Sequence, residues 1–508
     1  MNMPNPLNLP NPLISGFNPD PSIVKVGGDY YLATSTFEYL PGIPIYHSTD
    51  LVSWTRIGHV VDREGQLHSR DVPTLGGAWA PTIRFHDGLF YLAVTDAMAR
   101  GTLVFTATDP AGPWSDGLVI EGAVGIDQDL AWDDDGTAYM TYSGLDTVTG
   151  NITEHGGILQ VRVDLESGRA LEEPRSVWSG TGLMFPEAPH LYRHGGYWYL
   201  MIAEGGTERG HSVSIARGTS PEGPFENNPA NPVLSARSTD RPIQNTGHGD
   251  LVQTPDGGWA MVLLGMRPRG MTRAFSALGR ETFITPVTWE DGWPVVQPVI
   301  LNPRPGAEFE DNFTDPSLDG GWIAVRRFPE TFASTTERPG RLTVTGDGSG
   351  LDDPRPAFLG RRQKHQVETI SALVDAGSPA DRGNAGGLAV RYDEAHHYSI
   401  ELNGTTVTAR ARISSIEQSW TRQVPGGPLE LRIETREPKP DNAIGSLSSD
   451  TVALQVVVDG KFVTLAELDG RYLSAETAAS FTGRVAGVFA SRGTVAFDWF
   501  RSSGREPH

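Results

Sequence analysis

Apolar and polar positions alternate along the first 265 residues in a pattern that occurs five times. Each copy has an alternating apolar stretch, a turn that contains glycine, and a second apolar stretch that carries an aromatic residue. The copies are DPSIVKVGGDYYLATS (20–35), WAPTIRFHDGLFYLAVT (79–95), DQDLAWDDDGTAYMTYS (127–143), EAPHLYRHGGYWYLMIA (187–203) and HGDLVQTPDGGWAMVLL (248–264). Period-2 alternation around a tight turn is typical of a β-hairpin. The pattern therefore predicts five hairpins.

The spacing of the copies predicts how the hairpins are arranged. Successive copies begin roughly 50 to 60 residues apart, which suits one four-stranded blade per copy. Each hairpin is followed by a segment with two further short strands joined by polar, Pro- and Gly-rich residues: 46–61, 105–120, 159–178, 214–234 and 280–298. We expect a five-bladed β-propeller over residues 1–300. Such a propeller would bring the first residue of every hairpin to one axis.

The pattern changes after residue 300. LNPRPGAEFEDNF (301–313) has prolines and charges but no periodicity, so it is interpreted as a linker. Beyond it come ten plain alternating segments: GRLTVTG, VETISALVD, GGLAVRYD, YSIELN, TVTARARI, LELRIET, TVALQVVVDG, KFVTLAEL, GRVAGVFA and TVAFDWF. They predict a β-sandwich of the jelly-roll, concanavalin-like kind over 314–508. REPKPDNAIGSLSSD (436–450) is predicted to be a surface loop.

Composition narrows the classes of function. The chain has no cysteine, so it has neither disulfides nor thiolate chemistry. A formal charge of −21 argues against a nucleic-acid partner, because that binding depends on neutralising phosphates. No apolar run reaches the length of a membrane span, and the first residues, MNMPNPLNLPNPLISGF, lack the pattern of a secretory signal. We therefore expect a cytoplasmic protein with a small neutral ligand.

Three of the five hairpins begin with a carboxylate: Asp20, Asp127 and Glu187. Cleaving a glycosidic bond needs two carboxyl groups on opposite sides of the anomeric carbon, one to donate a proton and one to act as base or nucleophile. Carboxylates held close together also raise one another's proton affinity, which keeps an acid protonated near neutral pH. The alternative is that these are turn or capping residues at the start of a strand.

Several phrases resemble glycoside hydrolase family 43, and within it the branch of β-xylosidases and α-L-arabinofuranosidases that carries an extra C-terminal sandwich. They are NPLISGFNPDPSIVKVGGDYYLATSTFEYLPGIPIYHSTDLVSW, GGAWAPTIRFHDGLFYL, PEAPHLY, NTGHGDLV and LGRETF. The phrases occur in the family's order, one per blade, and the resemblance covers nearly the whole chain. It implies a five-bladed propeller that hydrolyses with inversion of configuration.

The resemblance also implies roles for the three carboxylates. Asp20 in NPDPS matches the general base that activates water, and Glu187 in PEAPHLY matches the general acid. Asp127 in GIDQDLAW matches the third carboxylate, which tunes and orients the acid. Acid and base in an inverting enzyme are expected roughly 6.5–9.5 Å apart. Some relatives have TEGPHLY where this chain has PEAPHLY, so the pocket beside the acid is expected to differ from theirs.

Five further residues are candidates for the site. Arg280 in LGRETF matches an arginine that pairs with a catalytic carboxylate; the alternative is a surface salt bridge of little energetic value. Phe37 and Trp79 are candidates for apolar faces against a sugar ring, against the alternative of core packing, and Phe481 in SFTGRV matches a sandwich residue that closes the pocket. The resemblance places a calcium ion or an ordered water beside His248. Calcium prefers oxygen ligands, so an ion there would be held largely through waters.

These observations predict an exo-acting, inverting glycoside hydrolase that needs no cofactor. Its expected substrates are short xylo- or arabinoxylo-oligosaccharides, from which it releases terminal β-D-xylosyl units or, as the alternative, α-L-arabinofuranosyl units. A hydrophobic pocket discriminates only weakly between near-isosteric sugars, so dual activity is compatible with this prediction. Two rival hypotheses are a non-catalytic carbohydrate-binding propeller and an interaction scaffold, both of which would be expected to lack some of the carboxylates. The composition permits a homo-oligomer without requiring one.

Overall fold

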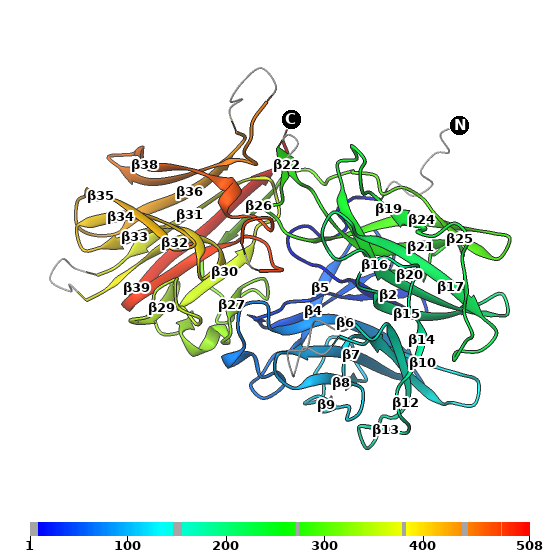
Figure 1. Cartoon of the computed structure of the whole chain (residues 1–508). Helices are drawn as coiled ribbons and strands as arrows, with labels where there is room; N and C mark the ends of the chain where they lie inside the picture. The colour runs from blue at the N-terminus through cyan, green and yellow to red at the C-terminus, as the bar shows by residue number, and fades with distance from the viewer. Residues whose placement is uncertain are drawn as a thin grey trace.

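The computed structural model describes residues 9–145, 155–270, 274–377, 383–438, 445–478 and 480–507. Its described residues form β-strands and three single-turn 3₁₀ helices, η1 (Ser69–Asp71), η2 (Pro329–Thr331) and η3 (Gly470–Tyr472). The blue-to-green half of the chain forms a propeller and the yellow-to-red half forms a sandwich beside it (Figure 1). None of the described helices has the length and apolar character needed to cross a membrane. The predicted all-β class is confirmed.

The propeller has five antiparallel sheets, one for each predicted hairpin and its outer segment. Blade 1 contains β1 (Ser22–Val26), β2 (Asp29–Ala33), β4 (Gly42–Ser48) and β5 (Thr55–Val61), and blade 2 contains β6 (Gly77–His86), β7 (Leu89–Ala97), β8 (Gly101–Ala107) and β9 (Leu118–Val119). Blade 3 contains β10 (Ile126–Trp132), β11 (Ala138–Ser143), β12 (Ile158–Asp164), β13 (Arg169–Ala170) and β14 (Arg175–Trp178). Blade 4 contains β15 (Glu187–His194), β16 (Tyr197–Glu204), β17 (Ser212–Gly218), β18 (Glu226–Asn227) and β19 (Leu234–Ser235). Blade 5 contains β20 (Gln244–Gln253), β21 (Trp259–Met266), β24 (Glu281–Glu290) and β25 (Trp293–Val296), and β22 (Arg269–Gly270) pairs with β23 (Ala274–Phe275) apart from it.

The first strands of the five blades form the inner ring of the propeller. β1 contacts β6, β6 contacts β10, β10 contacts β15, β15 contacts β20, and β20 closes the ring against β1. Hydrophobic clusters fill the spaces between adjacent blades, as Leu92 and Ile45 do between blades 1 and 2. The first residues of the hairpins therefore lie around one axis, as the repeat predicted.

A backbone irregularity marks the start of four of the inner strands. The pairing register shifts just after Trp79, Ile126, Glu187 and Gly247. At the start of every hairpin one residue has a left-handed φ: 55° at Asp20, 44° at Ala80, 58° at Asp127, 49° at Ala188 and 47° at His248. Bulges of this kind redirect a side chain at the end of a strand and are common beside active sites. The repeat thus encodes a local geometry that turns side chains toward the axis.

A buried ion network joins the inner strands below these residues. The Arg84 guanidinium lies 2.8 Å from Asp129 and 2.9 Å from Asp250, and Tyr192 donates its hydroxyl proton to Asp250. Ser22 also donates to Asp250 (2.8 Å), so each of the five blades contributes one polar side chain. Burial alone would raise the pKa of Asp250, but the charges of Arg84 and His190 and the hydrogen bonds from Tyr192 and Arg84 together outweigh it and hold that pKa below its usual range. The network cross-links the blades at the axis and fixes the positions of the residues above it.

The sandwich is built around one long strand. Its strands are β26 (Ala307–Asp311), β27 (Ile323–Val325), β28 (Ala333–Ser334), β29 (Leu342–Asp347), β30 (Phe358–Arg362), β31 (Val367–Asp375), β32 (Ala385–Asp393), β33 (His396–Asn403), β34 (Thr406–Ile413), β35 (Ile416–Gln423), β36 (Leu429–Arg436), β37 (Thr451–Val458), β38 (Lys461–Asp469) and β39 (Val485–Arg505). The first half of β39 pairs with β32 and the second half with β31. The two last predicted strands, GRVAGVFA and TVAFDWF, are therefore one continuous strand.

Two boundaries differ from the prediction. Within the predicted linker 301–313, β26 pairs with β39 and belongs to the sandwich sheet. Residues 439–444 of the predicted surface loop lie outside the described residues, but Asp450 at its end is buried and accepts hydrogen bonds from the Arg484 guanidinium. Because the residues buried here are a charged pair and not apolar side chains, no alternation of apolar and polar positions in the sequence marks them as buried.

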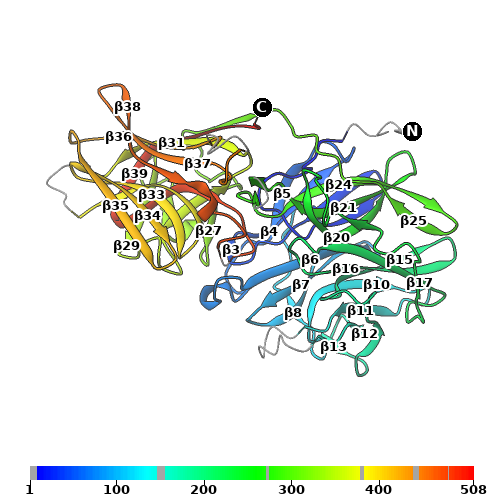
Figure 2. The ribbon, with the colours of Figure 1, turned by 45° about the horizontal axis from the view of Figure 1, so that its top comes forward.

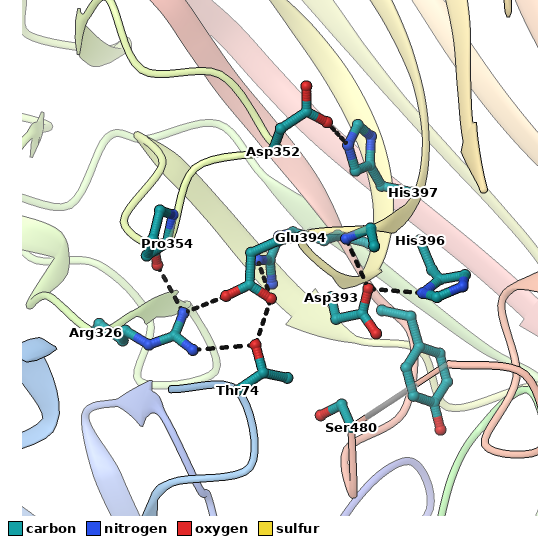
Figure 3. A network of polar contacts seen from close by, with 12 residues as sticks. Thr74, Arg326, Asp352, Pro354, Asp393, Glu394, His396, His397 and Ser480 are labelled. Atoms are coloured by element: carbon teal, nitrogen blue, oxygen red, sulfur yellow. Dashed lines mark hydrogen bonds and ion pairs between the residues drawn. The ribbon is translucent and has the colours of Figure 1, made fainter. Parts of the chain in front are cut away.

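The two domains lie side by side (Figure 2). β3 (Tyr39–Leu40), from the propeller, pairs with β27 of the sandwich. Arg326 crosses the interface: its guanidinium donates to the backbone oxygen of Val72 (2.7 Å) and lies 2.9 Å from Glu394 (Figure 3). Thr74 of the propeller donates to the same Glu394 carboxylate at 2.6 Å. These contacts hold the sandwich against blades 1 and 2.

Candidate active site

Asp20, Asp127 and Glu187 meet at the axial end of the inner strands. Asp20 lies two residues before β1, Asp127 lies in β10, and Glu187 is the first residue of β15. The backbone N–H of Ala188, next to Glu187, donates to Asp127 Oδ2 at 3.0 Å. The charge of Asp20 acts on both other carboxyls. Three residues separated by 60 to 167 positions in the sequence thus form one carboxyl cluster.

Two hydrogen-bond donors hold the Asp20 side chain in place. The Arg280 guanidinium donates to Asp20 Oδ1 at 3.0 Å, and the Ser35 hydroxyl donates to Oδ2 at 2.6 Å. Only 4% of Asp20 is exposed, so these charge-assisted hydrogen bonds replace water around it. Ser35 in turn accepts a hydrogen bond from the Ala80 backbone N–H (2.7 Å), which fixes the hydroxyl between blades 1 and 2. This environment suits a group that must accept a proton.

The environments of Glu187 and Asp127 shift the pKa of both carboxyl groups upward. Burial, and then the charge of Asp127, raise the pKa of Glu187 well above its ordinary value. Burial, and then the charge of Asp20, raise the pKa of Asp127 to about 7. Arg280 opposes both shifts without cancelling them. Glu187 on blade 4 and Asp127 on blade 3 thus have environments that favour their protonated forms, whereas Asp20 on blade 1 is paired with the Arg280 guanidinium.

Arg280 lies inside the site and not at the surface. Its guanidinium bridges Asp20 and the Thr207 hydroxyl, which accepts at 3.0 Å. The same guanidinium lies over the rings of Phe37 and Phe481, with its central carbon 5.5 and 5.1 Å from their centroids. With 6% of its surface exposed, Arg280 is not the weak surface ion pair that the sequence left open.

Three aromatic side chains from both domains form one side of the site. The Phe481 ring lies 5.9 Å from that of Phe37 and 5.6 Å, edge to face, from that of Trp79. Phe37 is fully buried, whereas Trp79 and Phe481 keep part of their surface exposed. We infer that the exposed parts of Trp79 and Phe481 are available to a ligand, while Phe37 mainly supports Arg280.

The segment that carries Phe481 reaches the propeller by close backbone contact. The Arg484 N–H donates to the Ala277 carbonyl at 3.1 Å. A Cβ on Gly279, whose φ is +71°, would lie 2.3 Å from the Thr482 oxygen, so glycine is required there. From the other side, the Tyr392 hydroxyl donates to the same Thr482 oxygen at 2.6 Å. The sandwich therefore positions one aromatic residue of the site.

His248 lies beside Asp20, with 3.6 Å between its Nδ1 and Asp20 Oδ1. Burial lowers the pKa of His248 to about 3, so the ring is neutral. The His190 ring lies 6.3 Å away, and its Nε2 is buried without a hydrogen-bond partner among the described residues. Two ring nitrogens and a carboxylate already paired with arginine do not fit a directly coordinated calcium ion, which prefers oxygen ligands.

No group of three or more His, Cys, Asp or Glu side chains in the described parts of the chain is arranged to hold a metal ion. The cation expected beside His248 therefore remains a prediction.

Sequence reasoning missed four residues of this site: Ser35, Thr207, Glu208 and His211. The charge of Glu208 contributes to the raised pKa of Glu187, and the buried His211 ring packs on Gly247, where a Cβ would lie 2.3 Å from it. Thr207, Glu208 and His211 belong to GGTERGHS, a polar segment between two strands of blade 4. A run of charged and small residues after an apolar strand was the available signal, but it is equally typical of an ordinary turn.

The comparisons with known proteins match the fold and both domains. Residues 9–294 match the family model described as glycosyl hydrolases family 43, and residues 310–503 match the one described as the beta xylosidase C-terminal concanavalin A-like domain. The chain is 37% identical to the non-reducing end alpha-L-arabinofuranosidase BoGH43B of Bacteroides ovatus, over 96% of this chain and 94% of that protein. It is 36% identical to a xylosidase/arabinosidase of Butyrivibrio fibrisolvens, over 77% of this chain and 79% of that one.

A solved structure described as Bacteroides ovatus xyloglucan PUL GH43B superposes with a TM-score of 0.85 at 36% identity, covering 97% of this chain and 99% of that one. Both domains and their order are thereby accounted for together. The chain belongs to glycoside hydrolase family 43 and is a glycoside hydrolase with a five-bladed propeller and a C-terminal concanavalin-like sandwich.

Proposed function

We propose that the protein is an exo-acting glycosidase that removes a terminal pentosyl unit with inversion at the anomeric carbon. The observation that carries this proposal is the pairing of carboxyls in unlike environments in one site: Asp20 accepts a hydrogen bond from Arg280, and Glu187 has a raised pKa. An inverting hydrolase needs a carboxylate on one face of the sugar and a carboxylic acid on the other.

In this mechanism Asp20 accepts a proton from a water molecule as that water attacks the anomeric carbon. Glu187 donates its proton to the departing glycosidic oxygen in the same step. Arg280 and Ser35 hold the Asp20 side chain in its orientation before attack. After release of the sugar, the proton taken up by Asp20 returns to solvent and Glu187 is reprotonated, which closes the cycle.

Asp127 is assigned the role of keeping Glu187 protonated. In Asp127→Asn the amide oxygen still accepts the Ala188 N–H, but the negative charge beside Glu187 is lost. Removing a like charge lowers the pKa of Glu187, so the acid loses its proton at lower pH. We expect the alkaline limb of kcat/KM to move to lower pH by about one unit, which is the low end of the pKa shifts that a neighbouring charge causes.

The pH–rate profile of Asp127→Asn against wild type measures this shift. Glu208→Gln is a suitable comparison, because Glu208 is the last of the charges that raise the same pKa and its loss should move the limb less. An alkaline limb that does not move in Asp127→Asn would contradict the assigned role.

Terminal β-D-xylose is the proposed main substrate, with α-L-arabinofuranose as the alternative. Both activities occur in the names of the relatives, and the 37% identical Bacteroides ovatus protein is named for arabinofuranosidase activity. The substrates are proposed to be short xylo- or arabinoxylo-oligosaccharides taken up into the cytoplasm. The absence of cysteine agrees with that location.

Rates on 4-nitrophenyl β-D-xylopyranoside and 4-nitrophenyl α-L-arabinofuranoside, measured side by side, test the substrate. We expect kcat/KM to be higher on the xyloside, with measurable turnover of the arabinofuranoside because an apolar site discriminates weakly between similar sugars. A higher kcat/KM on the arabinofuranoside would favour the alternative. Turnover of neither substrate would favour a carbohydrate-binding propeller without activity.

A further inference from the structure

A cavity of about 690 Å³ lies between the propeller and the sandwich, apart from the carboxyl cluster. Its walls come from the N-terminal segment, the turn between β4 and β5, the segment before β26, and the β30 end of the sandwich. None of the candidate active-site residues lines it; the nearest in sequence is Asn18, two residues before Asp20. Its volume is in the range of small-molecule sites.

The charge of this cavity is opposite to that of the protein as a whole. Five cations line it, Arg56, Arg304, Arg361, Arg362 and Lys364, against the single carboxylate of Asp319. The chain as a whole has a formal charge of −21. A concave surface lined by one sign of charge concentrates the field and attracts ligands of the opposite sign. The positive charge of the cavity therefore attracts anions.

Asp319 does not neutralise this cluster, because two of the cations share it. The Arg361 guanidinium lies 2.5 Å from Asp319 Oδ1, and that of Arg56 lies 3.7 Å from Oδ2. The ionisable groups His365 and Glu368, close to these cations in the sequence, already have partners of their own. His365, also in the lining, is paired with Glu506 at 3.1 Å, and Glu368 accepts the backbone N–H groups of Lys364 and His365. The local balance remains strongly positive.

Apart from Asp319, the groups that hold Arg361 and Arg362 are aromatic rings and a backbone oxygen, which supply no negative charge. Arg361 lies over the Phe309 ring at 3.6 Å from its centroid. Arg362, only 7% exposed, lies 4.5 Å over Phe17 and donates from Nε to the Phe17 carbonyl at 2.9 Å. Its Nη2 has no hydrogen-bond partner among the described residues. A buried guanidinium with an unused donor costs free energy that an anion would recover.

The electrostatics of the cluster agree with this geometry. Burial lowers the pKa of Arg362 to about 10, and the positive charges of Arg56 and Arg361 contribute to the shift. Both causes disfavour the charged form of the guanidinium, as expected for cations crowded together without enough negative charge between them. An anion in the cavity would favour the charged form of the Arg362 guanidinium.

We propose that this interdomain cavity binds a small organic ligand that carries at least two negative charges, as carboxylate or phosphate groups. Arg56 and Arg361 present guanidinium groups that suit bidentate recognition of such groups, and Arg304 and Lys364 supply charge at the entrance. Trp54 and Tyr46 in the same walls offer flat faces to the body of the ligand. Because the walls belong to both domains, bound ligand stabilises their contact.

Isothermal titration calorimetry with three probes at low salt tests this site. The phosphate arm is glucose 6-phosphate, the carboxylate arm is citrate, and glucose is the neutral control. We expect at least one of the acidic probes to bind, glucose to show no binding, and the affinity to fall as sodium chloride is raised. The bound probe is also expected to raise the melting temperature, since it binds only the folded protein.

The double variant Arg304→Gln, Lys364→Gln localises the binding. Both residues are exposed and make no contact with the carboxyl cluster, so turnover of nitrophenyl pentosides should be unchanged while the Kd of the acidic probe rises at least tenfold. Arg338→Gln, Arg422→Gln removes the same charge from exposed sandwich positions outside the cavity and should leave the Kd unchanged. Lack of binding by either acidic probe, equal binding of glucose, or the same Kd in both double variants would overturn the proposal.

Discussion

Replacing Glu187 by alanine is expected to lower kcat by about 10²–10⁴-fold on substrates with poor leaving groups, the usual contribution of a general acid. The loss follows from the raised pKa of Glu187, which makes it the proton donor of the cluster. A leaving group that departs as a stable anion needs no proton. On a 2,4-dinitrophenyl pentoside we therefore expect the variant to recover most of the wild-type rate, and a Brønsted plot of kcat against leaving-group pKa to become steep.

Glu208→Gln is the matched control for that experiment. Glu208 is close enough for its charge to act on Glu187, yet it is not assigned a proton-transfer role. It should keep the shallow leaving-group dependence of the wild type. If Glu187→Ala lost the same factor on good and poor leaving groups alike, Glu187 would not be the acid.

Replacing Asp20 by asparagine is expected to lower kcat by a similar factor, about 10²–10⁴, on every substrate. Water must lose a proton as it attacks, whichever leaving group departs, so activated substrates should not rescue this variant. Asparagine keeps the size of the side chain and an oxygen that can accept from Arg280 or Ser35. The contrast between the two variants across one series of leaving groups is therefore the expected signature of separate acid and base.

A loss of stability would confound the Asp20 result, because Arg280 is buried and would face a neutral partner. Melting temperatures of wild type and variant, together with KM, separate folding from chemistry. Recovery of the Asp20→Asn rate on the 2,4-dinitrophenyl substrate would contradict the assignment of Asp20 as base.

The sequence predicted the propeller because its repeat carries three kinds of information together. The alternation of apolar and polar residues predicted the hairpins, and the spacing of the five copies predicted the blades. The first residue of each hairpin was the candidate for the chemistry. Ser22, Asp129 and Asp250, each two residues after a hairpin's first residue, could also have been recognised as a second ring of polar positions. They join the blades at the axis through Arg84.

Other features depend on how distant segments meet, and no local pattern reveals that. β35 is almost wholly exposed, so IEQSWTRQ has no apolar face to mark it as a strand. β26 pairs with β39 although it lies in a segment with charges and prolines nearby. The contacts of Arg280 with Thr207 and of Phe481 with Trp79 join residues 73 and 402 positions apart. Only the family resemblance identified Arg280 and Phe481.

The most direct test of the central claim, that Asp20 accepts a proton and Glu187 donates one on opposite faces of the sugar, is the configuration of the first product. Proton NMR of the anomeric signals during the first minutes of hydrolysis of 4-nitrophenyl β-D-xylopyranoside, or of the arabinofuranoside if that is the better substrate, reads it before mutarotation. Inversion predicts that α-xylose, or β-arabinose, appears first. First appearance of the retained anomer would contradict the account, because it would require a carboxylate that attacks the sugar instead of one that activates water.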